Sequence, residues 1–473
     1  MQVSVVGLVI CAVLLIVSYS QRGALTLALM ASFAFGSTSI GTLDALGGSS
    51  PLIYTVFAIL LVLSVFARKS FRYDFAMVFS RSKTAWILIV LALYASASAI
   101  ILPRLFAGQT TAFVPSRDSG EVLELPLAPV SGNLTQAAYF TLGVLIFVAL
   151  SMRLLRRENL QLVLRGFFAL CLVHAGLGLI DLAGKLFGAG DVLRFMRSAS
   201  YALATNVEEG GFYRIVGGFS EASAYGGYTL ACLAFTLTFW RRTGSTLALA
   251  LTICLSVLLV LSTSSTAYLG AVVIALLVAA SSLGAALEGK FLRQDLTLAG
   301  LALIALTAAF AIHLVNPDFF QPLIRLFETT VLNKSSSVSA DERMYWTTKS
   351  LQSLLDTAGL GIGLGSSRSS SWVVSVISQL GVLGSILMAA VVLEFARGAK
   401  QSRRSAADAE LVALHDSVRS FALLWIAAAV ISGGAAEPGA LFFVALATVI
   451  ACRQHLESDD RLIHYAPAAA TSS

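Results

Sequence analysis

The chain has 473 residues, of which 57% are apolar and only 12% charged, and its mean hydropathy is +0.83. Soluble globular domains have roughly 45–50% apolar and about 25% charged residues, so this composition excludes both a soluble enzyme and a disordered chain. The net charge of +6 comes from cations in short loops beside apolar segments. It therefore indicates membrane topology and contact with anionic lipids, not nucleic-acid binding.

Thirteen apolar segments of about 20 residues, the length that spans the hydrocarbon core of a bilayer, follow along the chain. Lipid offers no partner for backbone polar groups, so each segment is predicted to be helical. We expect an all-α polytopic membrane protein with about 12–13 transmembrane helices, forming one domain over residues 1–473. The first segment is expected to be a span and not a signal peptide, because no basic region precedes it. The segments lie near 3–20, 23–40, 51–67, 84–102, 135–152, 161–184, 222–240, 244–261, 265–283, 296–315, 372–396, 418–434 and 437–452.

The basic residues predict the orientation of the spans. One set of alternating loops holds 21 of the 32 Lys and Arg residues, and a bias of this size places the richer loops in the cytoplasm. The N-terminus is then periplasmic, and residues 453–473 form a cytoplasmic tail. The predicted location is the bacterial inner membrane.

Three predicted periplasmic loops are long enough to fold: 103–134, 185–221 and 316–371. The first contains four prolines and is expected to form an extended cap or lid. In the second, residues 191–204 mix large apolar side chains with Arg194 and Arg197, a pattern that suits an interfacial helix on the outer leaflet. The ordinary role of such arginines is to reach the membrane surface without binding a ligand.

The second loop ends in a candidate anion site. Arg214 precedes Gly217 and Gly218, and Glu221 stands at the start of the next apolar segment. An arginine beside flexible glycines can bind a phosphate through two hydrogen bonds, and helix-entry amides add positive potential. The alternatives are an arginine without a ligand at the membrane edge and a Glu221 that only caps its helix.

The third loop is predicted to contain helices at about 317–331 and 341–356. The second helix begins with Asp341 and Glu342, and Arg343, Trp346 and Lys349 share one face at helical spacing, with Tyr345 beside them. Two cations around an aromatic ring could bind a phosphorylated sugar. The same stripe could equally rest on lipid headgroups.

Alternating glycines follow this helix, at Gly361, Gly363 and Gly365, and lead to Arg368. Glycines permit a close approach of the backbone, and amides at the next helix start would favour an anion. The run lacks the GK[ST] of a P-loop. The simpler interpretation is a pliable linker between a loop helix and a span.

Ionisable residues are scarce within the apolar segments. Asp181 and Lys185 are four residues apart and are expected to form an ion pair near a helix end, with a proton relay as the alternative. No metal-binding spacing such as HExxH or CxxC is present, and we predict no cofactor.

The order of these features resembles that of bacterial O-antigen and exopolysaccharide polymerases of the Wzy type, within the O-antigen polymerase/ligase superfamily. The resemblance covers roughly residues 130–450. It includes the R-x-x-G-G-F-S-E element from Arg214 to Glu221, the Ser262–Thr266 junction, and Arg343-x-x-Trp346 before the glycine run. Ligases of the superfamily usually carry a histidine after that run, where this chain has Arg368 and serines.

The resemblance implies a bundle like that of the glycosyltransferase C class. The implied reaction joins undecaprenyl-diphosphate-linked oligosaccharide repeats at the periplasmic face, with membrane lipids and possible partners in a chain-length regulator and a flippase. Arg214 and Arg343 would hold diphosphates or the donor sugar. Glu221 is the candidate base, with Asp341 and Glu342 behind it, and no metal is required if arginines neutralise the diphosphate.

Two other classes stay open besides an O-antigen ligase. A flippase or transporter of lipid-linked oligosaccharides would also be polytopic, and should show ionisable groups along the bundle centre and inverted-repeat symmetry. A purely structural membrane protein would not need three folded outer loops.

Overall fold

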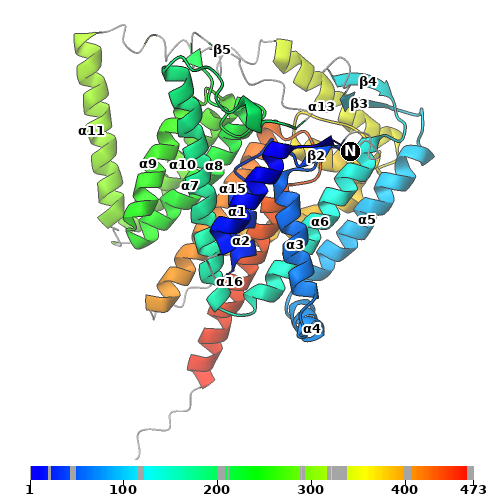
Figure 1. The fold of residues 1–473 in the computed structure, drawn as a ribbon, viewed down its shortest axis with the longest axis horizontal. Coiled ribbons are helices and arrows are strands. Elements are labelled where there is room, and N and C mark those ends of the chain that lie inside the picture. Colours follow the sequence, from blue (N-terminus) through cyan, green and yellow to red (C-terminus); the bar gives the residue numbers. More distant parts are fainter. Residues whose placement is uncertain are drawn as a thin grey trace, which may run out of the picture.

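The computed structural model describes residues 2–19, 23–42, 49–115, 122–199, 208–209, 212–287, 289, 293–316, 321, 338–398 and 406–465. Helices dominate this part of the chain (Figure 1). Eight of the described helices are long and apolar enough to cross a bilayer, as expected of a polytopic α-helical membrane protein. They are α5 (Lys83–Leu105), α6 (Ser131–Leu154), α7 (Glu158–Leu186), α10 (Ser265–Leu287), α11 (Arg293–Val315), α14 (Trp372–Ala396), α15 (Ala406–Ser432) and α16 (Ala440–Tyr465).

Other described helices fall short of a full span by length or composition. α1 (Val5–Tyr19) and α9 (Thr246–Leu261) are apolar but shorter, and α8 (Ala222–Thr243) is long enough but less apolar. α3 (Ile53–Phe66) and α4 (Phe71–Arg81) are bent by 104° against each other and would make a ninth span only if the pair counts as one. The structure therefore offers eight or nine full-length spans among its described residues, against the 12–13 predicted.

The span predicted over 23–40 is not formed as one helix, because α2 (Ala24–Ser32) has only nine residues. Beyond α2 the chain turns through a polar run that finds partners in the 187–221 connection. The Ser37 hydroxyl donates to the Gly218 carbonyl at 3.0 Å, and the Ser39 hydroxyl lies 3.0 Å from that of Ser198. The hydrogen bonds to this distant segment stabilise a buried turn in place of two further helical turns.

Each described strand belongs to a two-stranded antiparallel sheet. β1 (Gln2–Val3) pairs with β2 (Gly41–Thr42), and β5 (Glu208–Glu209) pairs with β6 (Phe212–Tyr213). The longest pair, β3 (Thr111–Pro115) with β4 (Val122–Pro126), is a hairpin in the 103–134 connection, in which Phe113 lies opposite Glu124. The extended structure predicted for this proline-rich loop is confirmed.

The long connections gather at one end of the bundle. In Figure 1 the β3–β4 hairpin, β5 and α13 (Val338–Asp356) lie at the top, whereas α4 and the last turns of α16 lie at the bottom. We call the end of the bundle that carries the β3–β4 hairpin, β5 and α13 the loop end. α16 continues to Tyr465, so the predicted tail at 453–473 begins as helix, and residues 466–473 lie outside the described part.

Close helix packing forms the core of the bundle. Phe167 of α7 stacks on Phe235 of α8 at 5.1 Å between ring centroids and meets Phe421 of α15 edge-on at 5.3 Å. Gly227 lets α8 approach α15, because a Cβ there would lie 3.3 Å from the Cβ of Ala428. These contacts fix α7, α8 and α15 as the frame that carries the loop end.

The outer faces of the bundle are strongly apolar, as lipid contact requires. α11 exposes Leu303, Ile304, Leu306 and Phe310, each by more than 60%. A soluble protein of this size does not expose such contiguous apolar surface, so the fold supports insertion in a membrane.

Candidate functional site

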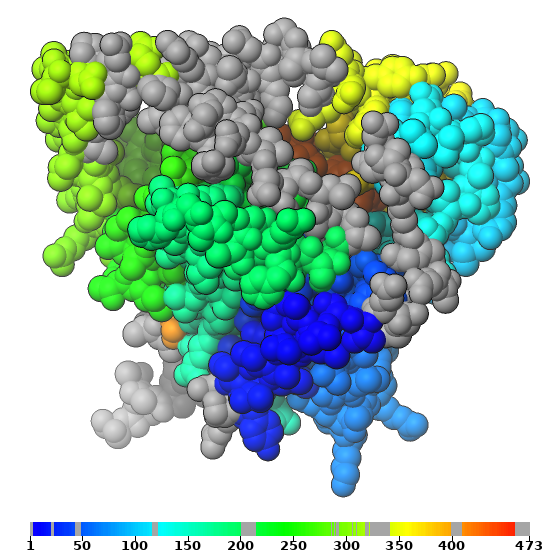
Figure 2. Space-filling model, turned by 45° about the horizontal axis from the view of Figure 1, so that its top comes forward, coloured from blue at the N-terminus to red at the C-terminus, as the bar shows by residue number. Residues whose placement is uncertain are grey.

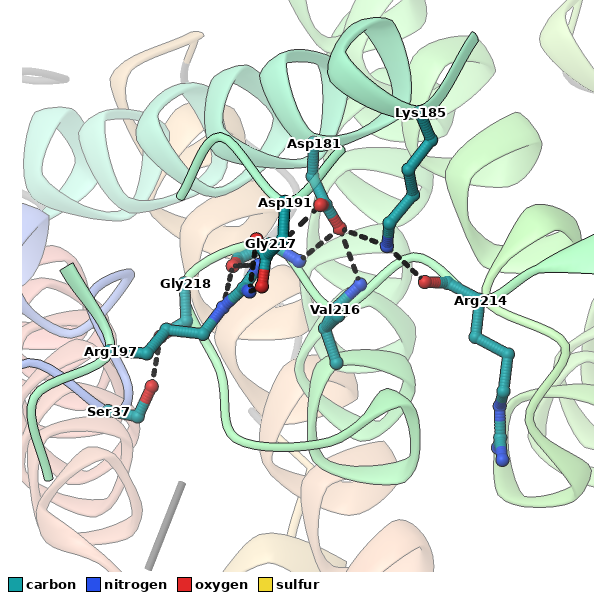
Figure 3. A network of polar contacts seen from close by, with 9 residues as sticks. All are labelled: Ser37, Asp181, Lys185, Asp191, Arg197, Arg214, Val216, Gly217 and Gly218. Carbon is teal, nitrogen blue, oxygen red and sulfur yellow. Dashed lines mark hydrogen bonds and ion pairs between the residues drawn. The ribbon is translucent and has the colours of Figure 1, made fainter. Parts of the chain in front are cut away.

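A network of buried charges fixes the 187–221 connection to the end of α7 (Figure 3). Asp181 Oδ2 accepts hydrogen bonds from the backbone amides of Val216 and Gly217, at 2.8 and 3.0 Å, and from Lys185 Nζ at 3.0 Å. Lys185 also donates to the Arg214 carbonyl. The predicted Asp181–Lys185 ion pair is confirmed, and it holds the backbone of the next segment in addition to the helix end.

Arg197 is the second cation of this network. Its side chain is only 2% exposed, and its Nη1 donates to both carboxylate oxygens of Asp191, at 2.6 and 2.5 Å. Its Nε and Nη2 donate to the Gly217 carbonyl, and Nη2 lies 3.5 Å from Asp181 Oδ1. The interfacial prediction is wrong for Arg197, because two aspartates offer it buried counter-charges that a local sequence pattern does not reveal.

The predicted interfacial helix over 191–204 is also not observed as such. Only Arg194–Met196 form a short 3-10 turn, and residues 200–207 lie outside the described part. This segment therefore serves mainly to carry Arg197 into the bundle.

The network presents the R-x-x-G-G-F-S-E element in a fixed conformation. Gly217 has a φ of +52°, and a Cβ on Gly218 would lie 2.7 Å from the Ala34 carbonyl oxygen. The side chain of Arg214 points away from the network in Figure 3, while its carbonyl faces Lys185. Both glycines are therefore used for close packing, which holds the backbone that carries Arg214 in place.

Glu221 stands at the first position before α8, where the sequence predicted either a base or a helix cap. Its side chain makes no capping hydrogen bond and is exposed, and it accepts a hydrogen bond from the Ser223 hydroxyl at 2.6 Å. The capping alternative is therefore wrong. The role as a base stays a prediction.

α13 confirms the predicted helix over 341–356, and its aromatic and basic stripe packs on the β3–β4 hairpin. The Tyr345 hydroxyl donates to Glu124 Oε2 at 2.6 Å, and Lys349 Nζ lies 3.9 Å from Glu124 Oε1. The Trp346 ring lies 5.6 Å from that of Phe113. Tyr345, Trp346 and Lys349 of this stripe therefore hold α13 against the β3–β4 hairpin. Asp341 and Glu342 are exposed, and the predicted helix at 317–331 lies outside the described residues.

The glycine run forms a tight, buried passage between helices. Gly361, Gly363 and Gly365 all have positive φ angles, from +80° to +92°. Their amides donate to Thr357 Oγ1, to the Gln379 carbonyl and to Gln379 Oε1, respectively. Since protein acceptors already occupy the three amides, these amides are not open to an anion, and the role predicted for the amides at the start of α14 stays a prediction.

A serine after the glycine run joins the backbone of Arg343 to the segment that carries Arg368. The Ser370 hydroxyl donates to the Arg343 carbonyl at 3.2 Å, and Arg368 lies two residues before Ser370. Among the described residues, the guanidinium groups of both arginines are without an ion pair or a hydrogen bond to protein. Unlike Arg197, they are available to an anionic ligand.

Sequence reasoning missed an acid on the segment between α15 and α16. Glu437 follows Gly433 and Gly434 and precedes Pro438 and Gly439. Its Oε1 accepts the Gly439 amide at 2.9 Å, and burial raises its pKa to about 7. The available signal is an acid between two pairs of helix-breaking residues, whereas the apolar pattern places Glu437 at the start of the span predicted over 437–452.

The connection over 433–439, which we call the acidic segment because it carries Glu437, lies beside Arg368 and several aromatic rings. The Ser369 amide donates to the Gly434 carbonyl, and Arg368 Nε lies 3.4 Å from the position of a Cβ on Gly434. The Trp425 indole donates to the Pro438 carbonyl at 3.0 Å. In Figure 2 dark-orange atoms, whose colour corresponds to the end of α15 and the residues after it, lie deep in a hollow of the surface, near the yellow of α13 and the following segment.

The Ser262–Thr266 junction lies at the start of α10 and is buried. Thr263 has a φ of +48°, and a Cβ on Gly226 of α8 would lie 3.3 Å from Ser264 Oγ. This element of the resemblance thus packs on α8 a few residues after Glu221.

An apolar groove with a volume of about 510 Å³ lies between α5 and α6. Arg104, Asn133 and Thr141 are among its polar lining residues. Arg104 and Asn133 are next to the loop-end termini of the two helices, so the groove reaches the same end of the bundle as Arg343 and Arg368.

Comparisons with models of known protein families, with curated proteins and with solved structures found no match to this chain. The site is therefore interpreted from its own residues.

Proposed function

We propose that the protein is a membrane glycosyltransferase that joins undecaprenyl-diphosphate-linked oligosaccharide repeats into a polysaccharide at the periplasmic face of the bacterial inner membrane. The carrying observation is the pair of guanidinium groups at the loop end, on Arg343 and Arg368, that make no ion pair or hydrogen bond with the described protein. In the same chain the buried arginine Arg197 is fully paired. Cations left without a partner beside a hollow are suited to an anionic substrate.

The chemistry of a lipid diphosphate fits these groups. A diphosphate offers several negatively charged oxygens, and a guanidinium can bind two of them through parallel hydrogen bonds. As the glycosidic bond to the diphosphate breaks, negative charge develops on the leaving oxygen. Fixed cations stabilise that charge, and the positioning of donor and acceptor supplies much of the remaining acceleration.

The other parts of the substrate also find matching surfaces. The α5–α6 groove is apolar over most of its lining and suits an isoprenoid chain, with Arg104 at its rim for a phosphate. Aromatic rings near the acidic segment, such as Trp425 with Tyr228 at 4.6 Å between ring centroids, suit the faces of sugars.

The decisive experiment supplies purified protein in liposomes with lipid-linked repeats and follows polymer formation as a ladder of products. Wild type is expected to form polymer. Arg343→Ala and Arg368→Ala are each expected to reduce the rate at least about a hundredfold, because an arginine that contacts transition-state charge contributes several kcal/mol. Arg156→Ala is the matched control, since Arg156 is exposed at the opposite end of the bundle.

Three outcomes would contradict the proposal. Polymer at wild-type levels in both Ala variants would remove the two arginines from the site. Transfer of single repeats to a lipid A acceptor without chain growth would favour a ligase. Movement of lipid-linked repeats across the liposome membrane without bond formation would favour a flippase.

A further inference from the structure

Glu437 differs from the buried acids Asp181 and Asp191 at the loop end, because it is only partly buried and has no cation paired with it among the described residues. Within the described part of the chain its carboxylate makes no ion pair, and its Oε1 accepts a hydrogen bond from the Gly439 amide. A carboxyl group in such surroundings is costly to keep unless it has a further role, because burial disfavours the charged form. By contrast, Glu124 is held by Tyr345 and Thr111.

The segment that carries Glu437 is rigidly placed. The Trp372 indole donates to the Ala436 carbonyl at 3.1 Å, and the Trp425 indole donates to the Pro438 carbonyl at 3.0 Å. Two tryptophans from α14 and α15 thus hold the backbone on both sides of the carboxyl group. A carboxylate that must accept a proton in a defined position needs this kind of support.

Cationic and aromatic groups surround the same segment. Arg368 Nε lies 3.4 Å from the position that a Cβ on Gly434 would occupy, and the Tyr139 phenol of α6 lies close enough to the Glu437 carboxylate to interact with it electrostatically. Tyr139 is the titratable group on a neighbouring helix that interacts with the Glu437 carboxylate within the described part of the chain. The Trp425 ring packs against the Tyr228 ring, which in turn packs against Phe219.

From this geometry we infer that Glu437, and not Glu221, accepts the proton of the acceptor sugar hydroxyl in the proposed polymerisation. The acceptor oxygen attacks the anomeric carbon of the donor, and the new C–O bond forms as the bond from that carbon to the diphosphate breaks. The proton passes from the hydroxyl to the Glu437 carboxylate, and undecaprenyl diphosphate leaves with the bonding electron pair. In this step Arg368, whose Nε lies beside Gly434 of the same connection, binds the departing diphosphate.

The acidity of the group suits this role. A pKa of about 7 leaves a substantial deprotonated fraction at neutral pH and makes the carboxylate a stronger base than an ordinary glutamate. Only the deprotonated form can accept the proton, so the rate should rise as the pH increases from about 6 to 8. The inference rests on the proposed function, since it assigns one step of that reaction.

The test compares Glu437→Gln with wild type in the liposome assay, at saturating lipid-linked repeats and over pH 6–8. Glutamine keeps an oxygen for the Gly439 amide but cannot act as the base. We expect kcat to fall about 10²–10⁴-fold, the usual contribution of general base catalysis, with KM little changed and the rise with pH abolished. Glu457→Gln, on an exposed turn of α16 at the opposite end, is the control.

The outcomes separate this inference from the function itself. If wild type forms no polymer, the proposed function fails. If wild type forms polymer and Glu437→Gln keeps a rate within threefold together with the pH dependence, only the role of Glu437 fails. A loss in Glu221→Gln with none in Glu437→Gln would assign the base to Glu221. Should Glu437→Gln not fold, a wild-type rate that is constant from pH 6 to 8 would still overturn the inference.

Discussion

Two groups of charged residues at the loop end differ in how far the protein itself satisfies them. In the first, Asp181, Lys185, Asp191 and Arg197 are buried and paired with each other and with the backbone of the 214–217 segment. In the second, Arg343, Arg368 and Glu437 make no ion pair within the described part of the chain. Asp181 and Lys185 lie in the last turns of α7 and Arg343 lies in α13, whereas Asp191, Arg197, Arg368 and Glu437 lie in the connections between helices.

This difference separates the charges that stabilise the fold from those that are available to bind a substrate. Burying a charge is costly unless it is paired, so the first group reflects selection for a fixed backbone. Leaving two cations and a partly buried acid without an ion pair gives up that stabilisation, which is the pattern expected where a ligand completes the interactions. The predictions below test this contrast from both sides.

The largest effect is expected from Asp181→Ala. It would leave Lys185 without its carboxylate and two backbone amides without an acceptor, and removing one partner of a buried ion pair costs about 3–5 kcal/mol. The free energy of unfolding, measured by denaturant titration in detergent, should fall by this amount. Asp356→Ala is the control, because Asp356 is exposed and its side chain accepts one hydrogen bond from a described residue, Thr110, and a change below about 1 kcal/mol is expected. Equal effects of the two variants would show that the network does not fix the fold.

A somewhat smaller loss is expected from Gly363→Ala, which tests whether the glycine run is structural. Its φ is +92°, and a Cβ there would lie 2.6 Å from the Ser98 carbonyl oxygen and 2.7 Å from Pro103 Cδ. Backbone strain together with overpacking should lower the free energy of unfolding by about 2–4 kcal/mol. Gly188→Ala has a similar φ of +70° but open space around it, so about 1 kcal/mol is expected there. A stable Gly363→Ala variant that has lost only substrate binding would instead give the glycine run a direct role at the site.

The unpartnered arginines should respond to a change that keeps their charge. Arg343→Lys and Arg368→Lys should each reduce kcat/KM for polymerisation about tenfold, or roughly 1.4 kcal/mol, because lysine cannot bind two diphosphate oxygens in parallel. Their thermal stability should match that of wild type, since neither guanidinium is bonded to the described protein. A marked loss of stability would place these arginines with the structural charges and erase the contrast.

Much of the helical framework can be predicted from the sequence, because long apolar runs have few alternatives in lipid. The segment over 23–40 could not be predicted, since Ser37 and Ser39 end the helix by bonding to Gly218 and Ser198, about 160 to 180 residues away. No local pattern contains that information.

The candidate site shows the same limit. The helix over 341–356 and the presence of Arg343 on it follow from local signals, but the partner of Tyr345 is Glu124, 221 residues earlier. Arg197 has the sequence pattern of a surface arginine, and only the fold brings it to Asp181 and Asp191. Glu437 was hidden in an apolar run, where a carboxyl group gives little periodic signal.

The contact between Tyr345 and Glu124 is an intermediate case, because this pair is satisfied by protein yet exposed, and the smallest effect is expected here. Hydrogen bonds from Tyr345 and Thr111 lower the pKa of Glu124 below its ordinary 4.5. A depressed carboxyl pKa stabilises the folded state above the unfolded-state value, and this contribution is lost as the pH falls through the folded-state value. The docking of α13 on the hairpin should therefore be constant from pH 7 to about 5 and weaken below about 4.

The difference in fluorescence between wild type and Trp346→Phe reports this docking, since Trp346 packs on Phe113. In Tyr345→Phe the strongest of the bonds to Glu124 is missing, so the acid transition should move toward the ordinary carboxyl value and become smaller. Polymerisation at neutral pH should change little, because exposed pairs contribute little to stability and Tyr345 is held by the cap. A large loss of activity in Tyr345→Phe would instead mean that α13 must be held against the hairpin for Arg343 to reach its substrate. In that case a contact within the protein would control an arginine that binds the substrate.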